Sequence, residues 1–277
     1  MQTQITTFYD QLLIVNAPME AQLYPLILLA IAVVILLSLH PKTNSYRKYD
    51  QFESGGSMKD STHSEYIPAL RFNWLTPFYD LIVGTTTREG VFKKSLIAQA
   101  AIQAKHNVLD LACGTGTLAI WAKQHQPLAN ITGVDGDLAV LSLSRKKAKK
   151  NGVHLQFDHA MSYSLPYADA TFDRVLSSLF FHHLTWQNKQ RTARELFRIL
   201  KPGAELHIAD WGSPTNTLMR GLFLFVQLLD GFKTTQDNVE GKLVTLFRDS
   251  GFANVTQRKT FSTIYGTMTL YSATKHG

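Results

Sequence analysis

Two glycines and two carboxylates are spaced as a ligand-binding loop would require. Gly114 and Gly116 belong to a loop that follows a short apolar run and opens a helix-like segment. Glycine lets the backbone turn sharply and approach a ligand, and a helix start leaves N–H groups free. Asp110 stands just before this loop, and Asp135 ends the next strand-like run. A carboxylate in that second place can accept hydrogen bonds from both hydroxyls of a ribose.

The same loop also fits a dinucleotide-binding fingerprint. Residues 114–119 read Gly-Thr-Gly-Thr-Leu-Ala and match the pattern G-x-G-x-x-G/A. Asp110 bears on the choice, because a carboxylate at the end of the first strand repels a pyrophosphate and attracts a cationic ligand. The alternative is that Asp110 only caps the loop. An NAD(P)-dependent oxidoreductase stays open as a second interpretation, although no Tyr-x-x-x-Lys pair follows the fourth strand.

Alternating strand-like and helix-like segments must position this loop. Strands are expected at 107–112, 131–135, 154–158, 172–178 and 204–210. Helices are expected at 117–126, at 137–150 with Asp137 as the N-cap, and at 187–200, where the run Lys201-Pro202-Gly203 stops the helix. This rhythm predicts an α/β fold with a Rossmann-like, doubly wound parallel sheet.

The last forty residues depart from that rhythm. A helix is expected at 239–250, ending at Gly251, followed by strand-like runs at 253–261 and 267–275 that are joined through Tyr265-Gly266. Two successive strands with no helix between them form an antiparallel pair. A parallel sheet that closes with an antiparallel hairpin is not the usual dinucleotide-binding arrangement.

Four stretches in order resemble one enzyme family. They are VLDLACGTG at 108–116, ITGVDGD at 131–137, SLPYADATFDRVLSSLFFHHL at 164–184 and LKPGAELHIADWG at 200–212. Together they resemble the class I S-adenosylmethionine (SAM) dependent methyltransferases, and most closely the ubiquinone/menaquinone-biosynthesis-like group. The resemblance covers roughly residues 69–274. It implies an enzyme that uses SAM as its cofactor.

The resemblance also implies which residues bind SAM. The methionine end is assigned to Asp110, Ala112, Cys113, Gly114 and Gly116, the ribose to Asp135, the adenosine to Gly136 and Asp137, and further contacts to Met161, Ser162 and Ser178. Tyr79 either closes over the cofactor or packs in the core. Two positions depart from the family pattern. Ala112 replaces a glycine, and Met161 stands where an acid often faces the adenine, so a modest affinity for SAM is expected.

Methyl transfer from a sulfonium is an in-line displacement, for which alignment and exclusion of water matter most and a general base is optional. His182 and His183 follow the fourth strand, and one of them is predicted to face the acceptor as a base or hydrogen-bond partner, unless both only pack. Adjacent histidines do not point the same way on a helix. No metal ligands are therefore expected.

Some methyltransferase subclasses are disfavoured by what the sequence lacks. Adenine N-methylation uses an Asn/Asp-Pro-Pro-aromatic run after the fourth strand, where residues 178–181 read Ser-Leu-Phe-Phe. Cytosine C5-methylation needs a free cysteine nucleophile, and the single cysteine, Cys113, lies in the cofactor loop. No specific nucleic-acid partner is predicted. Metal-assisted catechol methylation needs clustered acids, and none is apparent near the site.

The acceptor is predicted to be a small molecule with hydrophobic or lipid-like character. Residues 217–232 are strongly apolar and follow the fifth strand, so they either cover the substrate or form an ordinary buried helix. The formal net charge of +7 favours anionic partners such as a membrane surface. A non-catalytic SAM-binding or membrane scaffold protein remains a third interpretation, and the oligomeric state is not predicted.

The first residues predict a membrane anchor. Residues 1–22 form a tail, 23–40 carry an uninterrupted apolar run of transmembrane length, 41–64 read as a linker, and 65–277 form the methyltransferase domain. Lysines and arginines follow the apolar run, which predicts a single-pass protein with its catalytic domain in the cytoplasm. A start at Met58 would instead give a cytoplasmic protein without the anchor.

Overall fold

The computed structural model describes residues 88–276. Its helices are α4 (Glu89–Ala100), α5 (Thr117–His125), α6 (Leu138–Lys150), the 3-10 turn η3 (Phe181–His183), α7 (Trp186–Ile199), α8 (Thr217–Asp230), α9 (Phe232–Val239) and α10 (Leu243–Asp249). Its strands are β1 (Asn107–Leu111), β2 (Asn130–Asp135), β3 (Gln156–His159), β4 (Phe172–Ser178), β5 (Leu200–Trp211), β6 (Phe252–Thr263) and β7 (Gly266–Lys275).

The strands of this region form one mixed sheet. Their order is β3-β2-β1-β4-β5-β7-β6. The first five strands pair in parallel, and β7 inserts antiparallel between β5 and β6. The usual dinucleotide-binding sheet has the order 3-2-1-4-5-6. The predicted antiparallel hairpin is therefore confirmed, and it breaks the dinucleotide-binding order.

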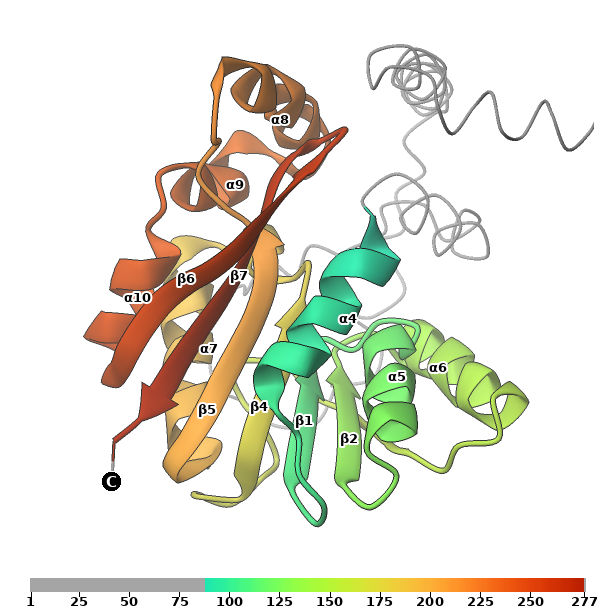
Figure 1. Cartoon of the computed structure of the whole chain (residues 1–277). Helices are drawn as coiled ribbons and strands as arrows, with labels where there is room; N and C mark the ends of the chain where they lie inside the picture. Colours follow the sequence, from blue (N-terminus) through green and yellow to red (C-terminus); the bar gives the residue numbers. More distant parts are fainter. Residues whose placement is uncertain (1–87, 277) are drawn as a thin grey trace, which may run out of the picture. The chain divides into compact units, whose positions relative to one another are not determined.

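Helices cover both faces of the sheet (Figure 1). On one face, α4, α5 and α6 bury a cluster that includes Leu96, Leu118 and Leu141. On the other face, α7 and α10 bury a second cluster that includes Leu196 and Phe247. Burying an aliphatic or aromatic side chain of this size contributes about 1.5–3 kcal/mol. These two layers fix the parallel strands whose carboxyl ends carry the candidate site.

Helices α8 and α9 lie beyond the carboxyl end of β5, beside the tip of the β6–β7 hairpin (Figure 1). Met219, Phe223 and Val226 of α8 are buried. Leu218 and Leu228 of the same helix are 61% and 73% exposed. The predicted apolar segment is therefore a cap helix that buries one face and leaves leucines on its surface.

The structure refines two expected element boundaries. The helix expected at 239–250 is the shorter α10, Leu243–Asp249, because α9 ends at Val239 and Gly241 has a left-handed φ of 72° between the two helices. The run 201–203, expected as a loop before the fifth strand, lies inside β5. Pairing with β4 shifts there, from Phe172 opposite Leu200 to Arg174 opposite Glu205, so the run is an irregularity within the strand.

Within residues 88–276, no helix is both long enough and apolar enough to cross a membrane. The predicted tail 1–22, the transmembrane segment 23–40, the linker 41–64 and Tyr79 lie outside the described residues. They remain predictions from the sequence.

Candidate active site

The loop between β1 and α5 alternates left-handed residues. Ala112, Gly114 and Gly116 have φ values of 54°, 55° and 79°. An alanine in this conformation carries a strain of roughly 1–2 kcal/mol, which explains why the family has glycine where this chain has Ala112. A Cβ added to Gly114 would meet no atom within 4 Å, whereas one on Gly116 would lie 3.0 Å from the Cβ of Ser144. Gly114 thus borders open space, and Gly116 is enclosed.

Asp135 joins the ends of β1 and β2. Its Oδ2 accepts a hydrogen bond of 2.9 Å from the backbone N–H of Gly114, and its Oδ1 accepts one of 3.0 Å from the N–H of Asp137. Burial raises the pKa of Asp135, and these N–H groups act against that rise. A carboxylate has about four acceptor positions. Asp135 therefore keeps capacity for the hydroxyls of a ribose while it holds the two loops together.

The turn after β2 carries the two residues that were predicted to lie beside the adenosine. Asp137 caps α6, as predicted, because its Oδ1 accepts from the N–H groups of Ala139 and Val140 at 2.8 and 3.3 Å. Gly136 lies between the two carboxylates, and its carbonyl oxygen is 3.1 Å from Nε2 of His159. The turn is thus fixed from β2, β3 and α6.

Asp110 is buried at the carboxyl end of β1. Its Oδ2 has no hydrogen-bond partner among the described residues. Burial raises the pKa of Asp110 to about 7, against the opposing effects of Lys93 and of the backbone N–H of Ala119. An unpaired buried carboxylate oxygen is costly. A cationic group of a ligand, such as an ammonium, would satisfy it and favour the ionised form.

Cys113 has a packing role in this loop. Its backbone N–H donates to the carbonyl of Val134 at 3.0 Å. A Cβ added to Gly133 would come within 3.0 Å of the Cys113 sulfur, so the neighbouring strand fits closely around it. Burial raises the pKa of the thiol, which keeps it protonated and unreactive.

The residues predicted for the adenine end lie in the segment after β3. Ser162 Oγ is 2.8 Å from Thr192 Oγ1 of α7. Met161 precedes it and accepts, through its carbonyl, the N–H of Ser164. Asp158 is engaged elsewhere, because its Oδ2 accepts from the hydroxyl of Tyr167 at 2.9 Å. Asp158 therefore does not replace the acid that is absent at Met161.

Ser178 is the last residue of β4 and leads into the second half of the site. The next residue, Leu179, has a left-handed φ of 56°. Its N–H donates to the carbonyl of Ala209 on β5 at 2.8 Å. This bend turns the chain into η3, where both predicted histidines lie.

His182 is buried and faces a carboxylate that sequence reasoning did not single out. Its Nδ1 is 2.7 Å from Oδ1 of Asp210, near the end of β5. The other donors to Asp210 are the backbone N–H groups of Phe180, Phe181 and Trp211 and the side-chain amide of Asn238. Burial alone would raise the pKa of Asp210, but His182 and these hydrogen bonds hold it below its usual range. Because an ionised carboxylate only accepts, Nδ1 of His182 carries a proton.

His183 lies against His182, with ring centroids 4.0 Å apart. Burial, with a further contribution from His182, lowers the pKa of His183 well below its usual value. The expectation that adjacent histidines diverge was wrong, because these residues form a single 3-10 turn rather than part of an α-helix. Asp230, at the end of α8, completes the group, with its Oδ2 3.6 Å from Nε2 of His182.

Acids do gather at this end of the sheet, against the sequence-based expectation. Asp210 and Asp230 are both within reach of His182, but they are 28 and 48 residues away in sequence. The signal for Asp210 was its place in LKPGAELHIADWG, directly after a strand. No sequence pattern indicated Asp230, because only the packing of α8 brings it there.

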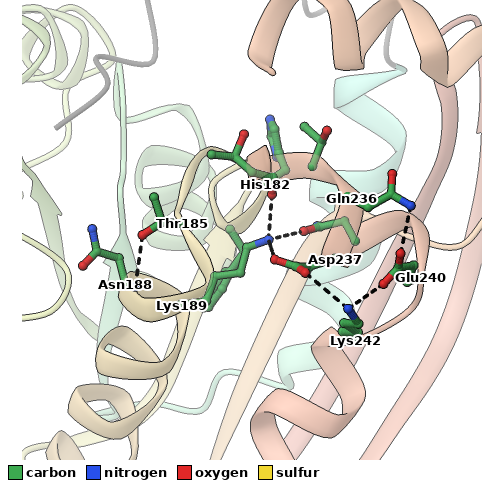
Figure 2. A network of polar contacts seen from close by, with 12 residues as sticks. His182, Thr185, Asn188, Lys189, Gln236, Asp237, Glu240 and Lys242 are labelled. Atoms are coloured by element: carbon green, nitrogen blue, oxygen red, sulfur yellow. Dashed lines mark hydrogen bonds and ion pairs between the residues drawn. The ribbon is translucent and has the colours of Figure 1, made fainter. Parts of the chain in front are cut away.

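A buried lysine supports this half of the site (Figure 2). Lys189 of α7 has no exposed surface, and its Nζ donates to the Thr234 carbonyl at 2.7 Å and to Oδ1 of Asn238 at 2.9 Å. Asp237 lies 3.4 Å from the same nitrogen. Asn238 in turn donates to Asp210 at 3.2 Å. Lys189 therefore ties α7 to α9, and α9 to the carboxylate that holds His182.

The sequence contains a signal that could have identified Lys189. It occupies the same helical stripe as Thr192, Ala193 and Leu196, at spacings of three, four and seven residues. A lysine on the buried stripe of an amphipathic helix needs an internal partner. That irregularity could have identified Lys189 as part of a buried polar network.

Comparison with known proteins agrees with this geometry. Residues 108–203 match a family described as a methyltransferase domain. A demethylmenaquinone methyltransferase from Thermus thermophilus is 30% identical over 52% of this chain and 65% of its own length. The ubiquinone/menaquinone biosynthesis C-methyltransferase UbiE of Blochmanniella floridana is 32% identical over 48% of this chain and 53% of its own. The chain thus spans less than two thirds of these relatives.

Solved structures show the same fold. A SAM-dependent methyltransferase from Methanosarcina mazei matches with a TM-score of 0.52 at 22% identity, covering 65% of this chain and 97% of that one. The SAM-dependent methyltransferase SibL matches with a TM-score of 0.60 at 16% identity, covering 76% and 60%. At these identities the likeness concerns the fold alone.

The sheet order, the glycine loop and the family match define a class I SAM-dependent methyltransferase. Within that class the chain is similar to a demethylmenaquinone methyltransferase and to UbiE, at 30% and 32% identity. SAM is the cofactor of this class. The residues present fit it, since Asp110 offers an unpaired buried oxygen and Gly114 borders open space.

Proposed function

We propose that this chain transfers the methyl group of SAM to a small hydrophobic or lipid-like acceptor, by in-line displacement at the carboxyl ends of β1, β4 and β5. The observation that carries the cofactor assignment is the buried Oδ2 of Asp110, which lacks a partner among the described residues. A pyrophosphate would place like charges together there, whereas the ammonium of SAM would pair with it. This favours SAM over NAD(P).

The individual contacts to SAM are part of the proposal. Asp110, with the loop residues Ala112, Cys113, Gly114 and Gly116, would surround the methionine end. Asp135 would hold the ribose, with Gly136 and Asp137 beside the adenosine. Met161, Ser162 and Ser178 would complete the pocket toward the adenine and the acceptor. The structure supports this arrangement because Asp135 already joins the β1 and β2 loops.

The acceptor is proposed to be a quinol precursor or another lipid-like molecule. The relatives are named for methylation of menaquinone and ubiquinone precursors. The α8 cap, with buried Phe223 and exposed Leu228, would present an apolar surface to such a molecule. His182 and His183 lie in η3, and His182 contacts Asp210 of β5 and Asp230 of α8, where an acceptor would meet the methyl group. Membrane association through residues 23–40 would bring the domain to a lipidic substrate.

The experiment that tests this function is calorimetric titration of the full chain with SAM and, separately, with NADH. We expect SAM to bind and NADH not to bind. Asp135→Asn and Asp135→Ala should weaken SAM by about 10- to 100-fold, because a charged hydrogen-bond acceptor to the ribose is lost. Asp169→Asn, at a surface side chain that is 78% exposed, is the control. Binding of NADH in preference to SAM would reject the proposal.

Binding alone does not establish methyl transfer. The [4+2]-cyclase SpnF shares the fold, with a TM-score of 0.54 at 17% identity over 67% of this chain and 80% of that one. Formation of S-adenosylhomocysteine in the presence of a demethylated quinol would therefore have to follow SAM binding. A chain that binds SAM and turns over no acceptor of this class would be a SAM-binding protein with another role.

A further inference from the structure

Three side chains from two distant segments converge at the end of β4. His182 and His183 come from η3, and Asp230 comes from the end of α8. One ligand atom from each lies within 4.8 Å of the other two. Nε2 of His182 and Oδ2 of Asp230 are 3.6 Å apart, which is longer than a hydrogen bond.

That separation is too long for a hydrogen bond but suits two ligands of one metal ion. Imidazole nitrogen and carboxylate oxygen bind divalent transition metals at about 2.0–2.2 Å. With bonds of about 2.1 Å, two donor atoms held 3.6 Å apart subtend an angle of about 120° at the ion. This angle lies close to that of a tetrahedral or five-coordinate site, so His182 and Asp230 need little movement.

Asp210 orients His182 for such a role. The hydrogen bond of 2.7 Å to Asp210 engages Nδ1, so Nε2, on the side of Asp230, is the ring nitrogen that is left for a metal ion. Histidines that bind metals commonly donate their other ring N–H to a carboxylate, and this sets both orientation and basicity. Asp210 is itself held by Asn238 and by the backbone of Phe180, Phe181 and Trp211. The supporting shell of a metal site is therefore in place.

We propose that His182, His183 and Asp230 bind one divalent first-row transition-metal ion, such as Zn²⁺, Mn²⁺ or Fe²⁺. Two imidazoles and one carboxylate suit these ions better than Mg²⁺ or Ca²⁺, which prefer oxygen ligands alone. Three protein ligands leave a coordination position open. We infer that an oxygen of the methyl acceptor would take this open position; this second part rests on the proposed function.

The test is metal binding by the full chain, purified in mild detergent and stripped with a chelator. Co²⁺ is titrated while visible absorption is recorded, and Zn²⁺ is titrated by calorimetry. We expect one ion per chain and a Co²⁺ absorption typical of nitrogen and oxygen ligands. Asp230→Asn and His183→Gln should each weaken binding by about tenfold or more, since each removes or weakens one of three ligands. Asp230 is the better variant because its side chain is 27% exposed.

The controls are His154→Gln and Asp249→Asn, which change an exposed histidine and an exposed aspartate away from the cluster. They should bind metal like the unchanged chain. Less than about one tenth of an equivalent of bound ion, or an equal loss in the control variants, would overturn the proposal and assign the cluster to hydrogen bonding alone. SAM is titrated into the same preparations. Failure of SAM to bind would reject the proposed function and leave the metal result standing.

Discussion

The two ends of the candidate site are built in different ways. At the proposed cofactor end, one contiguous loop supplies Ala112, Gly114 and Gly116, and this end is shaped mainly by the left-handed backbone of these residues. At the acceptor end, His182, Asp210 and Asp230 come from η3, β5 and α8 and are held by side-chain contacts. The first end is encoded by neighbouring residues. The second exists only after the chain has folded.

Because of this difference, the two ends are sensitive to different kinds of substitution. A backbone loop with left-handed glycines is sensitive to the residue type at single positions. A buried polar network is sensitive to the loss of any one member, because its partners are then left unpaired in a low-dielectric interior. Variation among acceptors can therefore arise by exchanging α8 or α9 while the cofactor loop stays the same.

The largest effect is expected from Asp210→Asn. The amide has one acceptor oxygen, so several of the N–H groups that now meet the carboxylate, and His182, would lose their partner. We expect a loss of about 3–5 kcal/mol in the free energy of unfolding, measured with urea. Asp169→Asn at the surface should change it by less than about 1 kcal/mol. Equal effects of the two variants would remove the contrast between the acceptor end and the surface.

Replacing the buried lysine should also lower the free energy of unfolding, with the effect concentrated in α9. Lys189→Met leaves the Thr234 carbonyl and Oδ1 of Asn238 without their donor. We expect a loss of about 1–3 kcal/mol and faster amide hydrogen exchange in α9 than in α5. Lys201→Met is the matched control, because Lys201 is 38% exposed and pairs with Asp173 at the surface. Unchanged exchange in α9 would contradict the link from α7 to α9.

The pH dependence of SAM binding probes the cofactor end. The pKa of Asp110 is raised to about 7, so its contribution to stability is present below its usual pKa and is lost as pH rises through about 7. SAM reverses the balance, because its ammonium favours the ionised carboxylate. Affinity for SAM should fall about tenfold between about pH 8 and about pH 6, measured by calorimetry. Asp110→Asn should bind more weakly at high pH and lose this dependence. A full pH dependence in that variant would assign the titration to another group.

The smallest effect is expected at Ala112. Its left-handed φ of 54° is a conformation that glycine adopts without strain. Ala112→Gly therefore removes backbone strain from the folded state, and this gain offsets the cost of a more flexible unfolded chain. Thermal unfolding should show a change within about 1 kcal/mol, toward higher stability. Gly116→Ala, in the same loop, would bring a Cβ to 3.0 Å from Ser144 and should destabilise by about 1–3 kcal/mol. Similar effects at both positions would mean that the loop does not select its residues by conformation.

The sequence predicted what depends on neighbouring residues. The strands around the glycine loop, the Asp137 cap and the closing hairpin follow from local patterns, and the structure has them. The break at Gly241 and the irregularity at 201–203 were missed, because a helical or turn-like composition does not reveal a left-handed glycine or a shift in strand pairing. The contact between His182 and Asp230 could not be predicted, since it depends on how α8 packs against β7 and α9.

The central claim is that both ends form a single methyltransferase site. The most direct test is to compare the turnover of one variant with its affinity for SAM. The full chain and Asp230→Asn are given SAM and a demethylated quinol, and S-adenosylhomocysteine formation and SAM affinity are measured side by side. We expect the unchanged chain to turn over and Asp230→Asn to bind SAM within about twofold while its turnover falls by about tenfold or more. Unchanged turnover in Asp230→Asn would contradict the assignment of the acceptor end.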